Sequence, residues 1–221
     1  MAKVFISAGH GGSDPGAVAN NVKEKDLNLS IALACRDELE RHGVSVKMSR
    51  TKDEYDPVGD EVKECNAYGP ELAVSIHNNA GGGDGGEVFY HHGGGKGKTL
   101  AENILAEMVK LGQNSRGIKT RVNSQGKDYY AFIRNTTCPA VIVECAFVDN
   151  ATDLKILATE DDRKKMGVAI AKGILKTLGV EYQAEKGYWK VQVGACLYRE
   201  SAVALQKKIK AVGFDAFIVR E

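Results

Sequence analysis

The sequence lacks any strong excess of charge of one sign. Its 221 residues carry a formal net charge of +1, from 30 basic and 29 acidic side chains. Proteins that bind nucleic acid or anionic membranes through their overall charge need a clear basic excess, which this chain does not have. We therefore expect no nucleic-acid partner, and any ligand must be recognised by a local group of side chains.

Long apolar runs and several familiar motifs are also missing. No stretch is long enough to span a bilayer, and the chain opens Met-Ala-Lys without the features of a secretory signal. We therefore expect synthesis in the cytoplasm and no membrane insertion. The five cysteines lack Cys-x-x-Cys spacing, which disfavours a disulfide framework or a cysteine zinc knuckle. The absence of phosphate-loop motifs and of G-x-S-x-G disfavours a nucleotide site and a serine nucleophile.

Short apolar segments alternate with helical patterns along most of the chain. Strands are predicted at 3–7, 44–48, 72–76, 87–90 and 140–144. Helices are predicted near 24–42, 58–68, 97–112, 151–157 and 161–178, with a loop from about 114 to 127. Strands that alternate with helices in this way predict an α/β domain over residues 1–179, in which helices flank a mixed sheet in three layers.

A polar segment at 180–187 predicts a linker between this domain and a short tail, 188–221. The tail has the pattern of a βαβ unit, with a strand from Trp189 to Val193, a helix from Arg199 to Val212 and a strand from Phe214 to Val219. A unit of this size cannot cover both faces of its own sheet, so it needs a partner surface.

Three predicted strands lie next to side chains that ligate metals or transfer protons. His10 follows the first strand in a glycine-rich loop, His77 follows the strand at 72–76, and Glu144 lies in the apolar segment 140–147. Sites in open α/β sheets form at the carboxyl ends of strands, so we expect these residues to converge on one pocket.

Glu24, at the start of the long predicted helix, completes a candidate metal site. Two imidazoles and one carboxylate form the His₂Glu set of an open catalytic zinc centre, which leaves a fourth position for water. Alternatives remain open on local grounds: Glu24 could only complement the helix dipole, and His10 and His77 could be satisfied polar residues at strand ends. Glu144 could be a general base with a raised pKa or a partner in a structural salt bridge. The other histidines, His42, His91 and His92, are interpreted as surface or edge residues.

Four separated blocks of sequence, in this order, resemble a known family. They are Ile6-Ser7-Ala8-Gly9-His10-Gly11-Gly12-Ser13-Asp14-Pro15-Gly16, then Glu24, then Ser75-Ile76-His77-Asn78-Asn79-Ala80, then Val143-Glu144-Cys145-Ala146-Phe147-Val148-Asp149-Asn150-Ala151-Thr152-Asp153. With them, residues 2–178 resemble the zinc-dependent N-acetylmuramoyl-L-alanine amidases of the Amidase_3 type. The resemblance implies Zn²⁺ bound by His10, Glu24 and His77, with Glu144 as the catalytic glutamate.

The chain departs from the usual family pattern at two places. The family commonly has an arginine ahead of an Ala-Asn pair in the helix before the second histidine, where this chain has Glu61 and Cys65-Asn66. Cys145 stands where glycine is common. Neither change alters a residue that the resemblance assigns to the metal.

The tail resembles one βαβ half of a SPOR-type domain, a family that binds the glycan strands of peptidoglycan. The two resemblances together imply peptidoglycan as the substrate and partner. The implied reaction is hydrolysis of the amide between N-acetylmuramic acid and the L-alanine of the stem peptide. A zinc peptidase acting within the stem peptide and a non-catalytic wall-binding protein remain alternatives.

The combination of a wall hydrolase, a wall-binding tail and no signal peptide resembles a phage endolysin, released to lyse the bacterial host. A mother-cell lysis enzyme is the second interpretation. Two half-sized tails could complete one sheet, which gives the expectation of a homodimer through residues 188–221. The alternative is a monomer whose tail docks on its own catalytic domain.

Overall fold

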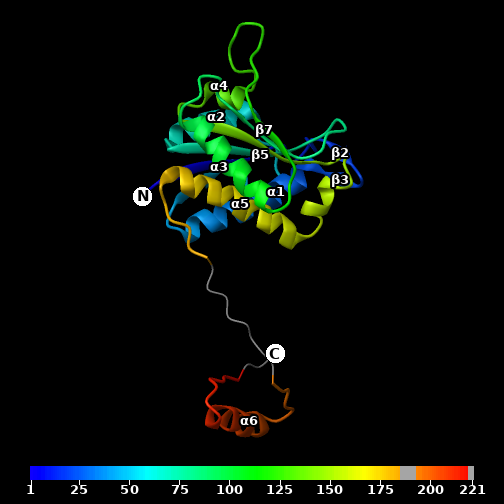
Figure 1. Cartoon of the computed structure of the whole chain (residues 1–221), viewed down its shortest axis with the longest axis vertical. Helices are drawn as coiled ribbons and strands as arrows, with labels where there is room; N and C mark the ends of the chain where they lie inside the picture. The colour runs from blue at the N-terminus through cyan, green and yellow to red at the C-terminus, as the bar shows by residue number, and fades with distance from the viewer. Residues whose placement is uncertain (185–192, 219–221) are drawn as a thin grey trace. The chain divides into compact units, whose positions relative to one another are not determined.

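A computed structural model describes residues 1–184 and 193–218 of the chain (Figure 1). The chain divides into two compact units, Met1–Gln183 and Ala184–Glu221. The sequence placed the start of a linker at residue 180, but Gln183 contacts the first unit, where its N–H donates to Nε2 of His42 over 3.0 Å.

The first unit is built around one mixed sheet of six strands, in the order β4-β1-β5-β8-β6-β7. The strands are β1 (Lys3–Ala8), β4 (Ser45–Met48), β5 (Leu72–Asn79), β6 (Gly86–Tyr90), β7 (Ser115–Lys119) and β8 (Ala140–Phe147). β4, β1, β5 and β8 run parallel, β6 runs antiparallel to β8, and β7 is parallel to β6. A small separate ladder pairs β2 (Val18–Ala19) with β3 (Val22–Lys23).

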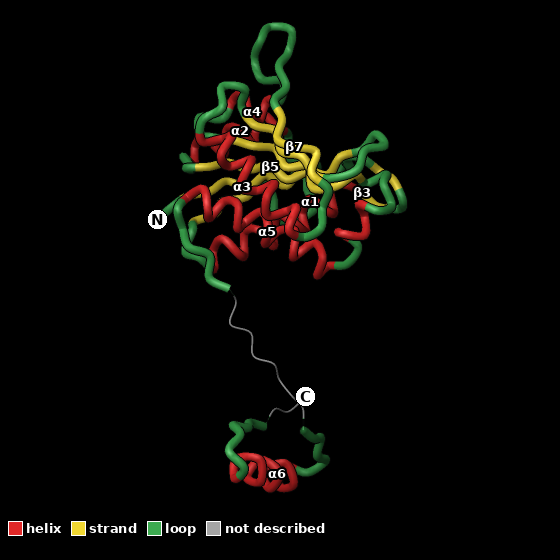
Figure 2. The backbone as a smooth tube through the Cα atoms, in the orientation of Figure 1, coloured by secondary structure: helices red, strands yellow, loops and turns green. Residues whose placement is uncertain are grey.

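Helices cover both faces of this sheet. They are α1 (Glu24–Arg41), α2 (Val58–Tyr68), α3 (Lys96–Lys110), α4 (Ala131–Asn135) and α5 (Glu160–Leu178). Successive side chains of a strand point to opposite faces, so Val4 and Ile6 pack with α1, α3 and α5, whereas Phe5 packs with α2 and α4. The sheet therefore lies between two helical layers (Figure 2), which confirms the predicted three-layer α/β architecture.

Sequence signals at the helix ends agree with the boundaries of the long helices. α5 begins with a capping box in which the side chains and backbones of Thr159 and Asp162 bond reciprocally. It ends at Gly179, whose φ of 74° is the left-handed conformation that favours glycine. α1 carries Glu24 and Asp26 in its first turn, where the helix dipole favours negative charge. Within the described residues, no helix combines the length and apolarity needed to cross a bilayer.

Parts of the first unit differ from the sequence-based expectations. The stretch predicted as a loop at 114–127 contains β7, whose sequence Ser-Arg-Gly-Ile-Lys has no apolar alternation and forms a strand by pairing with β6. The helix predicted at 151–157 is a 3₁₀ segment, Asp153–Leu157. β5 and β8 both run further than predicted, so His77 and Glu144 lie inside strands.

The described part of the second unit contains one helix, α6 (Arg199–Ala211), which confirms the helix predicted there. The strand predicted from Trp189 to Val193 falls outside the described residues except for Val193, which is not in a strand. Residues 214–218 of the other predicted strand are also irregular, because a strand needs a paired neighbour for its backbone hydrogen bonds. Phe214 and Phe217 are both 69% exposed.

Candidate metal centre

The three predicted ligands come from different elements and meet at the carboxyl ends of the inner strands β1 and β5. His10 lies in the loop after β1, Glu24 is the first residue of α1, and His77 lies near the carboxyl end of β5. One ligand atom from each residue lies within 4.8 Å of those from the other two. β1 and β5 are adjacent parallel strands, so the topology itself brings the two histidines together.

The Glu24 carboxylate lies between the two imidazoles. Its Oε2 is 3.2 Å from Nε2 of His10 and its Oε1 is 3.1 Å from Nδ1 of His77. The backbone N–H groups of Ala17 and Asn78 donate to the same two oxygens. Burial opposes ionisation of this carboxyl group, but the hydrogen bonds with the imidazoles hold the pKa of Glu24 well below its usual range. Glu24 is therefore a fixed negative charge that favours a cation between the rings.

A second carboxylate fixes the orientation of His10. Nδ1 of His10 lies 2.7 Å from Oδ2 of Asp14, so a proton on Nδ1 leaves Nε2 as the nitrogen that faces Glu24. The hydrogen bond with Glu24 outweighs burial and, together with Asp14, raises the pKa of His10 to about 9. Because that pKa describes the ion-free protein, a metal ion must displace a proton from His10 at neutral pH.

Two glycines make room for the three ligands. A Cβ on Gly9 would lie 2.1 Å from Cε1 of the His77 ring. Gly16 has a φ of +64°, and a Cβ there would lie 2.6 Å from Oε2 of Glu24 and 2.7 Å from Cδ2 of His10. Any side chain at either position would displace a ligand. The nitrogen and oxygen donors, held this closely, fit a small divalent cation such as Zn²⁺.

Glu144 lies beside this cluster, on the next strand of the sheet. It is in register with His77 on β5 and with Glu87 on β6, so the three side chains share one face of the sheet. Its Oε2 is buried and has no hydrogen-bond partner among the described residues. Burial raises the pKa of Glu144 to about 7, the range that suits an acid/base group at neutral pH. The structure thus places all four predicted residues together.

Comparison with protein families agrees with this geometry. The family model described as N-acetylmuramoyl-L-alanine amidase, Amidase_3, matches residues 4–176. The chain belongs to the N-acetylmuramoyl-L-alanine amidase family. A second family model, the SPOR domain, matches residues 167–220, beginning within α5. The chain is thus a peptidoglycan amidase, a hydrolase whose substrate and binding partner is the bacterial wall polymer.

Individual relatives cover both units or the amidase unit alone. The sporulation-specific N-acetylmuramoyl-L-alanine amidase of Bacillus subtilis (strain 168) is 34% identical over 223 residues, covering 99% of this chain and 85% of the relative. An endolysin of Bacillus phage SPP1 is 33% identical over 187 residues, covering 80% of this chain and 66% of the relative. The catalytic domain of CwlV, an amidase from Bacillus (Paenibacillus) polymyxa var. colistinus, superposes with a TM-score of 0.74 at 30% identity, over 82% of this chain and 100% of that domain.

A buried arginine that the sequence did not predict lies beneath His10 and Glu24. Arg50 is 2% exposed, and its guanidinium donates to the carbonyls of Ala8 (2.7 Å), Gly9 (3.2 Å) and Lys25 (2.8 Å). These carbonyls flank His10 and Glu24, so Arg50 ties the loop after β1 to the start of α1. No local pattern marks Arg50, because its partners are distant backbone groups.

The carboxylate of Glu87 was also missed, although it opens a predicted strand whose other residues are hydrophobic. Nε of Arg116 donates to its Oε2 over 2.7 Å, Lys119 contacts the same oxygen, and Asn79 donates to its Oε1 over 3.1 Å. These partners hold the pKa of Glu87 below its usual range against the effect of burial. Of the two carboxylates paired across β6 and β8, Glu144 is therefore the one with a buried oxygen that accepts no hydrogen bond.

Glu61, which stands where the family commonly has arginine, lies in α2 and is 5% exposed. Burial raises its pKa to about 7, although a hydrogen bond with Ser7 and the nearby His77 act in the opposite direction. The buried side chain thus favours its neutral form in the folded amidase.

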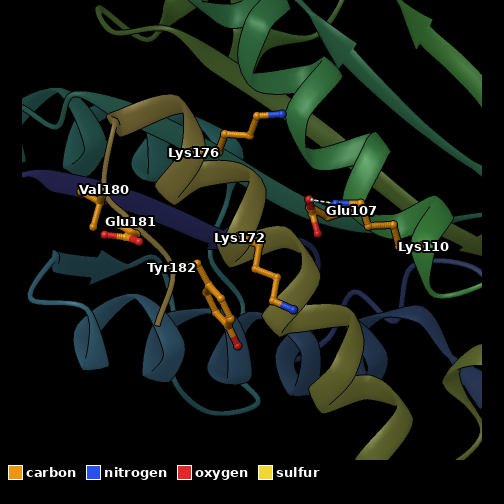
Figure 3. Close-up of a pocket in the computed structure, with 7 residues that line it drawn as sticks. All are labelled: Glu107, Lys110, Lys172, Lys176, Val180, Glu181 and Tyr182. Atoms are coloured by element: carbon orange, nitrogen blue, oxygen red, sulfur yellow. Dashed lines mark hydrogen bonds and ion pairs between the residues drawn. The ribbon is translucent and has the colours of Figure 1, made fainter. Parts of the chain in front are cut away.

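A surface hollow of about 430 Å³ lies elsewhere, between α3, α5 and the segment that follows α5 (Figure 3). Lys172 and Lys176 project from α5, and Lys110 pairs with Glu107 on α3. This hollow lies on the face covered by α3 and α5. His77 and Glu144 point to the other face, in phase with Ala73 and Ile142, which pack with α2 and α4. The hollow offers no metal-ligand set, so its volume does not mark the reaction site.

Proposed function

We propose that this amidase is zinc-dependent, with Zn²⁺ bound by His10, Glu24 and His77, and that Glu144 is its general base. One observation carries the proposal: a buried carboxylate oxygen without a hydrogen-bond partner lies in register with a histidine of a His₂Glu cluster. A structural salt bridge would have given Glu144 a cationic partner, as Arg116 does for Glu87.

The proposed reaction cleaves the amide between the lactyl group of N-acetylmuramic acid and L-alanine. When bound, Zn²⁺ supplies a Lewis acid that lowers the pKa of a water ligand and polarises the scissile carbonyl. Glu144 takes a proton from the attacking water and returns it to the nitrogen of the leaving L-alanine. Asp14 and Glu24 keep the imidazoles oriented while this proton moves.

The test uses purified walls, with the amidase treated first with EDTA and then with Zn²⁺. We expect chelation to abolish release of stem peptides that begin with L-alanine, and added zinc to restore it. Mass spectrometry of the digest separates the alternatives, because internal peptide cleavage would indicate a zinc peptidase and no release a wall-binding protein. Activity that survives thorough chelation would disprove the zinc dependence.

We further propose a lytic role, in which the amidase acts on the wall after release from the cytoplasm as an endolysin. The phage SPP1 relative supports this role, whereas the Bacillus subtilis relative favours a role in sporulation. Rapid lysis of permeabilised vegetative cells by the amidase supports the endolysin. Action restricted to walls of sporulating cells would support the second role.

For the second unit we propose glycan binding and pairing with a second copy through residues 188–221. Exposed apolar side chains on this unit support a need for a partner surface, with Leu197 90% and Tyr198 66% exposed. Light scattering and co-sedimentation with walls, on the full chain and on a chain ending at Gln183, test the two parts separately. A full chain that is monomeric at micromolar concentration would rule out the homodimer.

A further inference from the structure

A second group of two histidines and one carboxylate lies at the end of the sheet away from Glu144. β6 is antiparallel to β8, with Glu87 opposite Glu144 and Tyr90 opposite Val141. The chain therefore moves away from the candidate active site as it passes along β6 into the turn that holds His91 and His92. Asp128, from the loop after β7, meets them there.

The distances within this group match those in the first cluster. Nε2 of His91 is 2.9 Å and Nδ1 of His92 is 2.8 Å from the same atom, Oδ2 of Asp128. One ligand atom from each residue lies within 4.8 Å of the other two. The loop that supplies Asp128 projects from the first unit at the top of Figure 1.

Asp128 is held in place before any ligand arrives. It is 2% exposed, its Oδ1 accepts the backbone N–H of His92 over 2.9 Å, and its carbonyl accepts a hydrogen bond from Arg134 over 2.7 Å. These contacts aim Oδ2 at the imidazoles, as supporting hydrogen bonds do for metal ligands. Buried carboxylates are costly unless a cation or several donors compensate them.

The imidazoles, in contrast, are open to solvent. The side chain of His91 is 50% exposed and that of His92 is 44% exposed, with ring centroids 4.7 Å apart and planes at 25°. His91 also lines a hollow of about 370 Å³, together with Gly93, Lys96 and Cys138. An ion can therefore reach the three donor atoms, and water can complete its coordination.

We propose that His91, His92 and Asp128 bind a second divalent transition-metal ion, of the Zn²⁺ type, which fastens the 120–129 loop to the turn after β6. Two imidazoles and a carboxylate are donors that suit zinc and its neighbours in the first transition series. The ion here is structural, because no acid/base carboxylate such as Glu144 stands in register beside these histidines in the described part of the sheet.

Binding requires protons to move within the two rings. Without an ion, Nδ1–H of His92 donates to Oδ2 of Asp128, and Nε2 of His91 lies 2.9 Å from the same oxygen. Nδ1 of His91 accepts the N–H of Gly93 over 3.0 Å. With an ion, each neutral ring carries its proton on the other nitrogen, and Gly93 N–H turns to water. No proton leaves the protein in this exchange. The coordinate bonds must therefore stabilise the site by more than the hydrogen bonds that they replace.

The test counts zinc bound by the full-length amidase after chelation and reloading, by elemental analysis and calorimetry. We expect two ions per chain for the wild type, one for the His91→Asn/His92→Asn double variant and one for His77→Ala, which isolates the second site. Asp161→Asn, an exposed carboxylate on α5, is the matched control and should keep two. No ion in His77→Ala, or a zinc content in the double variant equal to that of the wild type, would overturn the proposal; one ion in the wild type that persists in His77→Ala would instead count against the first cluster.

Two further measurements separate the effect of a bound ion from that of the direct contacts between the two imidazoles and Asp128. In His77→Ala, Zn²⁺ at about 100 times its Kd should raise the unfolding temperature by roughly 5 °C and slow tryptic cleavage after Arg121 and Lys127. Asp128→Asn should abolish both effects while keeping peptidoglycan hydrolysis within about twofold in an otherwise wild-type chain. Zinc-independent stability and cleavage in His77→Ala would show that the hydrogen bonds alone hold the loop. Failure of the proposed zinc amidase would leave these outcomes unchanged, because they do not depend on turnover.

Discussion

Two clusters in the first unit combine two histidines with one buried carboxylate, and their surroundings differ. His10 and His77 approach edge to face, with planes at 82°, and their side chains are 27% and 23% exposed. His91 and His92 are stacked at 25° and about half exposed. Donor chemistry alone therefore does not separate a reaction centre from a structural site. The difference lies in what stands next to the donors.

The first cluster is assembled by tertiary structure and the second by a turn. His10 and His77 meet because β1 and β5 are neighbours, and Glu24, 53 positions from His77 in sequence, reaches them from the start of α1. His91 and His92 are adjacent residues that need only Asp128 to reach them. In the first cluster, the proposed ligands lie beside the face of the sheet that carries Glu144. In the second cluster, the two imidazoles face solvent.

The largest expected effect comes from removing a ligand of the first cluster. His77→Ala should abolish zinc binding there and reduce wall hydrolysis by about 10³-fold or more, since Lewis-acid stabilisation is worth several kcal/mol. His91→Asn should leave hydrolysis nearly unchanged. Equal losses of turnover in the two variants would break the distinction between a reaction centre and a structural site.

Glu144→Gln tests what stands beside the first cluster. The variant keeps every proposed ligand but cannot accept a proton, so we expect unchanged zinc content and a loss of roughly 10²–10⁴-fold in turnover. Single-turnover release of stem peptides measures it. Near wild-type kinetics would show that the proton acceptor is another group.

Arg50→Met tests how the first cluster is supported. The carbonyls of Ala8, Gly9 and Lys25 lose the hydrogen bonds from Arg50, although Gly9 keeps the one from Asn28, and this should reduce the free energy of unfolding by about 3–5 kcal/mol. Urea denaturation measures this, with the exposed Arg36→Met as the control. The second cluster should keep its ion under native conditions. An Arg50→Met protein as stable as the control would show that the loop and α1 are joined by other contacts.

Glu61→Gln should give the smallest effect, and one that depends on pH. The pKa of Glu61 is raised from 4.5 to about 7 in the folded protein. Between pH 4.5 and 7, Glu61 is therefore ionised in the unfolded chain but still protonated in the folded protein. The wild type should therefore lose stability relative to Glu61→Gln as pH rises from 5 to 8, by up to about 3 kcal/mol. Parallel urea titrations at both pH values measure it, and a constant difference would show that Glu61 is not held neutral.

Local patterns and strand ends in the sequence were enough to predict the candidate site residues and most of the sheet. His10, Glu24, His77 and Glu144 could be named because each sits at the end of a strand, at the start of a helix or in an apolar run, and their convergence follows from parallel topology. The roles of zinc and of Glu144 stay predictions. β7 was missed because its strand character arises from pairing with β6 and not from alternation.

The missed residues share a different property. Arg50 and Asp128 derive their importance from partners far away in sequence, and Glu87 from two cations on a strand that the pattern did not predict. His91 and His92 were interpreted as surface residues, which their exposure supports, but the carboxylate between them comes from a distant loop. Such long-range pairings have no signature in a short window of sequence.

Arg50 has a consequence for the order in which the amidase matures. Its guanidinium joins the His10 loop to the start of α1 through backbone carbonyls, without using the metal ligands themselves. The chain therefore pays the entropy of ordering this loop during folding, before an ion is present. We therefore expect zinc, at the proposed site, to bind to ligands that are already in place, so that loading follows folding and is limited by the arrival of the ion and the departure of protons. On the proposed zinc dependence, we expect the amidase to persist folded but inactive wherever zinc is scarce.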